Sequence, residues 1–293
     1  MAHKAGFVNI IGNPNVGKST LMNVFVGEKL SIITSKSQTT RHRILGIVNG
    51  EDFQIVYSDT PGVIKPAYKL QESMLSFSKS ALSDADVLLY VTDIYEKSDK
   101  NAEFLSMVKQ AQVPVLLIIN KIDQSTPEQL DELVDMWHNE FPNAEIIPTS
   151  AIKSFNTENI FNRILELLPE SEPFYPKDAL TDKTERFFVQ EIIREKILKY
   201  YKKEIPYATE IEVEEFKEDA KMIRMRAIIY VERETQKGII IGHKGIAIKK
   251  VGVESRKDLE QFFDKQVHIE LFVKVRKDWR NKEDDLRQFG YQN

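Results

Sequence analysis

The 293-residue chain contains no cysteine, and none of its apolar runs reaches the roughly 18 residues that a membrane-spanning helix needs. Without cysteine it has no disulfide framework and no thiolate chemistry, and the commonest zinc-site patterns are missing. The first residues, MAHKAGFVNI, lack the apolar stretch of a signal peptide. These absences favour a cytoplasmic protein.

What the chain does contain is typical of a globular protein with cores, since 42% of the residues are hydrophobic and 29% are charged. Its length favours two domains. The formal net charge of -4 hides an asymmetry, because residues 1–180 carry a net negative charge and residues 181–293 a net positive one. A polyanion would prefer the second part, although the difference is modest.

Residues 1–170 alternate between short apolar runs and helical patterns, which predicts an α/β domain with a mostly parallel, six-stranded sheet covered on both faces. Two consecutive runs, 44–49 and 53–58, are joined only by Gly-Glu-Asp and predict one antiparallel strand pair. Helices are predicted over 18–26, 68–83, 99–111, 127–140 and 156–168.

A proline-rich segment, residues 171–182, reads as an extended linker. The pattern then changes to α-β-β-α-α-β over residues 183–280, which predicts a second, α+β domain. It begins with an amphipathic helix over 183–203, and two of its helices flank a short GxxG loop. Residues 281–293 are polar and of mixed charge, and we expect a tail without an assigned role.

The segment GNPNVGKST matches G-x-x-x-x-G-K-[ST], after a strand and opening a helix. Such a loop directs backbone N–H groups at a phosphate, and the helix adds its positive N-terminal end. We expect Lys18 to reach the β- and γ-phosphates and Ser19 to ligate Mg²⁺. The predicted nucleotide-binding residues here are Gly12, Asn13, Pro14, Asn15, Val16, Gly17, Lys18, Ser19 and Thr20.

A second motif, DTPG, ends the third apolar run. We expect Asp59 to hold Mg²⁺ through water and the Gly62 N–H to sense the γ-phosphate. The polar segment before the hairpin, SIITSKSQTTRHR, suits a loop that a γ-phosphate and Mg²⁺ would order, with Thr40 as the preferred metal ligand over Thr39. A solvated loop with incidental threonines is an equally good interpretation of that segment. The site also includes Thr60, Pro61 and Val63.

A third motif, NKID, closes the apolar run VPVLLII. Guanine offers two adjacent donors that the Asp123 carboxylate can accept, whereas adenine presents an acceptor there and would leave the carboxylate unpaired. We expect Lys121 to pack its stem on the base and Asn120 to brace the loop. The following TSA segment adds Ser150 and the N–H of Ala151, which we expect to face the guanine O6.

The GHKG loop lies between two helical stretches of the second domain. Within that frame it resembles a type II KH domain, whose loop clamps single-stranded nucleic acid. Bare glycine backbone admits phosphates, lysines add charge, and isoleucines are candidates for an apolar groove. The predicted RNA-binding residues are Ile241, Gly242, His243, Lys244, Gly245, Lys249 and Lys250.

Taken in order, GNPNVGKST, QTTRHR, DTPGV, NKID, TDKTERFFVQEIIREKI, IIGHKGIAIKKVG and LFVKVRKDW resemble the Era family of GTPases over nearly the whole chain. The resemblance implies GTP hydrolysis with slow intrinsic turnover, GTP and GDP as ligands, and Mg²⁺ as cofactor. It also implies binding to 16S rRNA near its 3′ end and assistance in assembly of the small (30S) ribosomal subunit. We expect a monomer, and peripheral association with the inner face of the cell membrane is left open.

One departure from better-known small GTPases concerns Val63, which stands where those enzymes place a water-orienting glutamine. Similarity to Era-like proteins suggests that Asn15 helps to bind K⁺ beside the phosphates, although a loop-stabilising amide is the alternative. The expected catalytic residues are therefore Lys18, Thr40, Gly62 and Asn15.

Three other functions are alternative interpretations of the sequence. A P-loop kinase of a small molecule would leave NKID idle. An RNA-binding assembly factor could hold GTP with negligible turnover. A GTPase assisting RNA modification is disfavoured, because no cysteine, folate-like site or methyl-donor site is evident.

Overall fold

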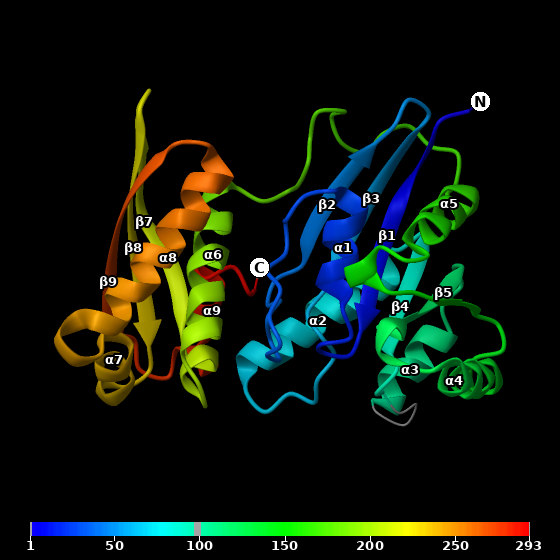
Figure 1. Ribbon diagram of the computed structural model, residues 1–293, viewed down its shortest axis with the longest axis horizontal. Helices are drawn as coiled ribbons and strands as arrows, with labels where there is room; N and C mark the ends of the chain where they lie inside the picture. The colour runs from blue at the N-terminus through cyan, green and yellow to red at the C-terminus, as the bar shows by residue number, and fades with distance from the viewer. Residues whose placement is uncertain (1, 97–100, 293) are drawn as a thin grey trace. The chain divides into compact units, whose positions relative to one another are not determined.

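The computed structural model describes residues 2–96 and 101–292, which divide into two compact units (Figure 1). Apart from a short stretch at Tyr68–Leu70, the first unit extends to Asp182 and the second begins at Lys183. None of the helices within these residues has both the length and the apolar character needed to span a bilayer.

The first unit is built on a six-stranded sheet with the strand order β2-β3-β1-β4-β5-β6. All neighbouring strands are parallel except β2 and β3, which confirms the predicted antiparallel pair. The parallel strands bring the ends of β1, β3, β4 and β5 to one edge of the sheet. The strands are β1 (Lys4–Gly12), β2 (Ile44–Asn49), β3 (Phe53–Asp59), β4 (Val87–Asp93), β5 (Val115–Asn120) and β6 (Glu145–Pro148).

Helices cover both faces of this sheet (Figure 1). They are α1 (Lys18–Val26), α2 (Lys69–Ser83), α3 (Ala102–Lys109), α4 (Pro127–Glu140) and α5 (Thr157–Leu167). Helices α2, α3 and α4 bury Ala81, Phe104 and Trp137 in one apolar cluster with the sheet. The helix predicted over 99–111 is shorter in the structure, and positions 99 and 100 lie outside the described residues.

The proline-rich segment is extended, as its composition predicts, but it is attached to the first unit. The Ile47 N–H donates to the Leu180 carbonyl at 2.8 Å, and the Leu45 N–H donates to Asp182 Oδ1 at 3.0 Å. Both donors belong to the edge strand β2, whose outer backbone groups would otherwise remain open to solvent or to another chain. The segment therefore also covers a sheet edge.

The second unit follows the predicted order α-β-β-α-α-β. Its three-stranded sheet has the order β7-β8-β9, with β7 and β8 antiparallel and β8 and β9 parallel. Residues such as Ile193, Ile229 and Val251 form one buried core between the helices and the sheet. The elements are α6 (Glu185–Tyr200), β7 (Glu210–Glu218), β8 (Met222–Val231), α7 (Glu234–Ile241), α8 (Ile246–Phe263), β9 (Gln266–Val275) and α9 (Glu283–Gln288).

Helix α6 is less amphipathic than the sequence predicts. Most of its apolar positions are buried, but so are four charged side chains, Glu191, Arg194, Glu195 and Lys196. Arg194 pairs with Glu191, and Lys196 pairs with Glu195 and with Asp258 of α8. Ion pairing makes burial of these charges tolerable, and apolar periodicity cannot reveal it.

The interpretation of residues 281–293 as a tail is wrong. Within this segment α9 forms, Leu286 is fully buried and Tyr291 is 2% exposed. The Tyr291 hydroxyl donates to Glu210 Oε2 at 2.6 Å, and the Arg276 guanidinium pairs with Asp285. The segment therefore packs on the second unit, through two apolar residues that its polar composition conceals.

Candidate nucleotide and nucleic-acid sites

The loop between β1 and α1 has a backbone that its glycines make possible. Gly17 has a φ of 101°, in the left-handed region that side chains disfavour. A Cβ at this position would lie 2.0 Å from Asn120 Nδ2, so any larger residue would collide with the end of β5. The loop is therefore held tightly against a neighbouring strand end, with the N-terminus of α1 directly behind it.

Lys18 is buried beneath this loop. Its Nζ donates to the carbonyls of Gly12 at 3.1 Å and Asn13 at 2.8 Å. Burial lowers the pKa of Lys18 to about 8, while the charges of Asp59 and Glu96 act in the opposite direction. An anionic phosphate at the loop would restore the ammonium charge, so the site is suited to such a ligand.

Three oxygen-bearing side chains meet beside Lys18. The Ser19 Oγ lies 2.7 Å from Asp59 Oδ2, and Thr40 Oγ1 lies 2.9 Å from the Ser19 Oγ and 3.3 Å from Asp59 Oδ2. Burial raises the pKa of Asp59, and the Lys18 charge opposes this rise. Carboxylate and hydroxyl oxygens are the ligands that Mg²⁺ prefers, so this group fits the metal.

Thr40 rather than Thr39 belongs to this group. The Thr39 hydroxyl instead bonds to Thr34 Oγ1 at 2.6 Å and to the Lys36 carbonyl at 2.7 Å, within its own loop.

Asn120 ties three loops together at the end of β5. Its Nδ2 donates to the Val16 carbonyl at 2.8 Å, and its Oδ1 accepts the Ala151 N–H at 3.0 Å. The Ser150 hydroxyl donates to Asp123 Oδ1 at 2.5 Å. The Ala151 N–H, which we expected to face guanine, is thus engaged by Asn120 in the structure.

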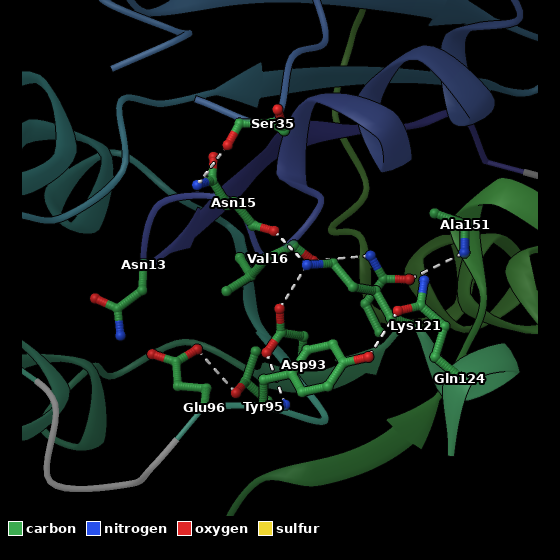
Figure 2. Close-up of polar contacts among 12 residues, drawn as sticks. Asn13, Asn15, Val16, Ser35, Asp93, Tyr95, Glu96, Lys121, Gln124 and Ala151 are labelled. Carbon is green, nitrogen blue, oxygen red and sulfur yellow. Dashed lines mark hydrogen bonds and ion pairs between the residues drawn. The ribbon is translucent and has the colours of Figure 1, made fainter. Parts of the chain in front are cut away.

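Lys121 extends from the same strand end toward the phosphate loop. Its Nζ donates to Asp93 Oδ2 at 2.6 Å and to the Asn15 carbonyl at 2.5 Å (Figure 2). The side-chain amide of Asn15 donates to the Ser35 carbonyl at 3.2 Å. Asp93 was not among the residues predicted from sequence, although it ends the run DVLLYVTD, which pairs with the strand that carries NKID.

Asn101 is a second residue that the sequence did not reveal. Its Nδ2 donates to the Val63 carbonyl at 3.0 Å and also to Asn13 Oδ1. The Val63 N–H in turn donates to the Gly12 carbonyl at 3.1 Å. Gly62 lies against the loop, since a Cβ there would approach the Pro14 Cα to 2.6 Å.

A cavity of about 420 Å³ lies at the phosphate loop, and Lys121 is the NKID residue in its wall, whereas Asp123 does not line it. Its walls come from the phosphate loop, the segment 32–40, Gly62 and Lys121, so the structure brings the three predicted motifs together. Thr20 lines the cavity, whereas the Thr60 hydroxyl points away and donates to the Ile10 carbonyl at 2.8 Å. Similarly, the Pro61 carbonyl accepts a hydrogen bond from Ser78.

The GHKG loop of the second unit has a left-handed backbone at Gly242, Lys244 and Gly245, with φ values of 71°, 51° and 76°. A Cβ at Gly242 would lie 2.6 Å from the Ala247 Cβ, whereas one at Gly245 would meet open space. His243 and Lys244 are exposed. The loop thus presents bare backbone and positive charge ahead of α8.

A groove of about 340 Å³ runs beside α8, between that helix and β9. Lys249 lines it, whereas Lys250 lies over the Tyr200 ring, 4.3 Å from its centroid. Arg256 and His268 add cationic or polar groups that we did not predict, although Arg256 follows Lys249 by two helical turns. The remaining lining residues are Ile248, Gly252, Val253, Ile269 and Leu271.

The fold and the two sites together define a P-loop GTPase domain followed by a KH domain. A family model described as 50S ribosome-binding GTPase matches residues 7–121, and a KH-domain model matches residues 204–280. GTPase Era of Staphylococcus haemolyticus is 42% identical over 99% of this chain and 97% of that protein. GTPase Era of Clostridium botulinum is 43% identical over 98% of both chains. The chain belongs to the Era family of GTPases.

Solved structures agree with this assignment. A crystal structure of Era in complex with MgGDPNP and nucleotides 1506–1542 of 16S ribosomal RNA has a TM-score of 0.95 and 39% identity, over 99% of this chain and all of that one. A crystal structure of a single-residue variant of Aquifex aeolicus Era bound to GDP·AlF₄⁻ matches to the same extent. The chain is therefore a GTPase rather than a small-molecule kinase.

Proposed function

We propose that this GTPase is a switch that binds 16S rRNA through its KH domain and assists assembly of the small ribosomal subunit in the cytoplasm. The observation that carries the proposal is that one chain combines a cavity at the phosphate loop with an exposed GHKG loop and a groove along α8, the helix that follows this loop. The 39%-identical Era structure, which contains a GTP analogue and 16S rRNA nucleotides, supports the identity of both ligands.

In the nucleotide site, the loop N–H groups and the N-terminus of α1 would receive the phosphates. Lys18 would exchange its bonds to loop carbonyls for the β- and γ-phosphate oxygens. Ser19, Thr40 and Asp59 would hold Mg²⁺, which neutralises phosphate charge when bound. The Gly62 N–H would face the γ-phosphate.

At the base, Asp123 would accept the two donors of guanine while the Ser150 hydroxyl keeps its carboxylate oriented. Asn120 would act indirectly, since it ties Val16 and Ala151 into one frame. Lys121 would lay its stem along the base.

Positioning of the attacking water requires a group other than Val63, which cannot hydrogen-bond through its side chain. We assign charge compensation to K⁺ bound near Asn15, whose amide nitrogen donates to Ser35 and leaves the amide oxygen as an acceptor. Hydrolysis should then be faster in K⁺ than in Na⁺, and Asn15→Ala should remove the difference. Equal rates in the two salts would contradict the potassium assignment.

The RNA function is tested by Gly245→Asp, which places a negative charge where the loop would meet phosphates. A Cβ at Gly245 meets no neighbour, and aspartate tolerates a left-handed backbone better than most residues, so the fold should survive. We expect affinity for a single-stranded oligonucleotide from the 16S 3′ end to fall at least ~10-fold in a gel-shift titration. Basal GTP hydrolysis should stay within about 2-fold of the parent protein. Unchanged RNA affinity would refute the assignment of the loop.

A further inference from the structure

Asp93 occupies a position that the topology makes adjacent to the base-recognition motif. It is the last residue of β4 and pairs in register with Asn120, the last residue of β5. Because parallel strands end at the same edge, the Asp93 side chain lies next to Lys121, which follows Asn120 directly (Figure 2). None of the motifs that identify the nucleotide site includes Asp93.

Both carboxylate oxygens of Asp93 are used. Oδ1 accepts the Tyr95 N–H at 3.0 Å, which locks the carboxylate onto its own turn, and Oδ2 accepts Lys121 Nζ at 2.6 Å. The side chain is only 9% exposed. The negative charge is therefore a fixed part of the scaffold, oriented by the backbone independently of Lys121 (Figure 2).

The Lys121 ammonium has a second partner besides Asp93. Lys121 has a left-handed backbone, with a φ of 65°, and its side chain is 28% exposed. The same ammonium donates to the Asn15 carbonyl at 2.5 Å, and the Asn15 side chain reaches the Ser35 carbonyl at 3.2 Å. One ion pair thus lies at the start of a series of contacts from β4 through the phosphate loop to the segment 32–40.

We propose that Asp93 is a positioning residue of the nucleotide site, which acts by holding the Lys121 ammonium on the phosphate loop. The proposal rests on the assignment of Lys121 to the guanine base. A lysine side chain released from its partner gains rotameric freedom that nucleotide binding must then remove. With Asp93 in place, the stem of Lys121 is already extended along one side of the base site, and the Asn15 backbone is fixed before the ligand arrives.

The experiment measures GDP affinity by calorimetry in the full chain, for Asp93→Asn, Lys121→Gln and the double variant. Asparagine retains the shape of aspartate and an oxygen for the Tyr95 N–H, but its amide nitrogen replaces Oδ2, so both the charge and the acceptor for Lys121 Nζ are lost. We expect Asp93→Asn to weaken GDP binding about 10-fold, which corresponds to about 1.4 kcal/mol. In the Lys121→Gln background, the same change should have less than about a 2-fold effect, because Asp93 then has no ammonium to hold.

Glu140→Gln is the matched control, because it neutralises an exposed ion pair with Lys109 at 2.5 Å in the same unit. It should leave GDP affinity within about 2-fold of the parent protein.

Two results would overturn the role of Asp93. In the first, Lys121→Gln weakens GDP binding but Asp93→Asn does not. In the second, Asp93→Asn weakens GDP binding equally in the parent protein and in the Lys121→Gln background. If Lys121→Gln itself binds GDP as tightly as the parent protein, the base assignment fails, and the proposal fails with it. If Asp93→Asn does not fold, Asp93→Ala and Asp93→Glu are compared instead. Asp93→Glu retains the negative charge and should therefore bind GDP more tightly than Asp93→Ala.

Discussion

The hydroxyl of Ser19 lies 2.7 Å from the carboxylate of Asp59, although 40 positions separate the two residues in the chain. Ser19 stands in the first turn of α1 and Asp59 ends β3, which is hydrogen-bonded to β1. Adjacent parallel strands thus bring the phosphate loop and DTPG to one edge of the sheet. The oxygens of both motifs converge beside the buried Lys18, where nucleotide phosphates and Mg²⁺ would meet.

Gly17→Ala should abolish measurable GDP binding. The new Cβ would lie 2.0 Å from Asn120 Nδ2 at a φ of 101°, so either the Asn120 side chain must leave its bond to the Val16 carbonyl or the phosphate loop must shift. Gly27→Ala is the matched control, because Gly27 also has a positive φ but has no neighbour within 4 Å of its Cβ position. The control should lose about 1–2 kcal/mol of stability and keep its GDP affinity. Tight GDP binding by Gly17→Ala, measured by calorimetry, would contradict the role of this contact.

Asp123→Asn should change the base preference. Its amide keeps only one of the two acceptor oxygens that guanine requires, and this oxygen can still accept the Ser150 hydroxyl. The new NH₂ group can donate to the carbonyl that xanthine carries at that position. We expect GDP to bind about 100-fold more weakly and xanthosine diphosphate to bind more tightly than to the parent protein. The exposed Asp131→Asn on α4 is the control, and it should change neither affinity. A parallel loss of both ligands would place Asp123 outside base recognition.

Nucleotide binding should take up a proton at alkaline pH. The pKa of Lys18 is about 8 in the free protein, below its ordinary value of 10.5 because of burial, so most of the protein has a neutral Lys18 at about pH 9. Bound phosphates would raise this pKa again, and binding at about pH 9 should therefore consume nearly one proton. At about pH 7 the lysine is charged before binding, so the uptake should be much smaller.

The measurement compares GDP-binding heats in two buffers of different ionisation enthalpy at each pH. Heats that are independent of the buffer at about pH 9 would show that Lys18 does not face the phosphates.

Tyr291→Phe should destabilise the second unit by about 1–3 kcal/mol, because it removes the donor to a buried carboxylate oxygen of Glu210. Tyr207→Phe is the control, since in the described part of the chain the Tyr207 hydroxyl has no hydrogen bond and its loss should cost less than about 0.5 kcal/mol. Denaturant unfolding of both variants checks the difference. Equal free energies of unfolding for Tyr291→Phe and Tyr207→Phe would contradict a stabilising role of residues 281–293.

The features that depend on local backbone geometry could be predicted from short stretches of the sequence. The phosphate loop is contiguous, and the demand for glycine at position 17 is visible in the motif itself. The sheet topology also follows from sequence, because runs apolar on both faces, separated by helices, leave few arrangements open. NKID could then be placed next to the loop from its position at a strand end alone.

The features that were missed depend on partners far away in the chain. Asp93 and Asn101 belong to no motif. Strand pairing brings Asp93 to Lys121, and Asn101 meets Val63 only in the folded structure. The buried charges of α6 look solvent-exposed in the sequence because ion pairs leave no trace in apolar periodicity. Tyr291 was overlooked because a short segment with few apolar residues resembles a disordered end.

Titration calorimetry with GDP and ADP in the presence of Mg²⁺ tests most directly whether the cavity between the phosphate loop and NKID is a guanine-nucleotide site. We predict one GDP per chain, with at least ~100-fold weaker binding of ADP, because Asp123 finds no donor pair on adenine. Absence of binding heat with GDP, or equal affinity for the two nucleotides, would contradict that claim.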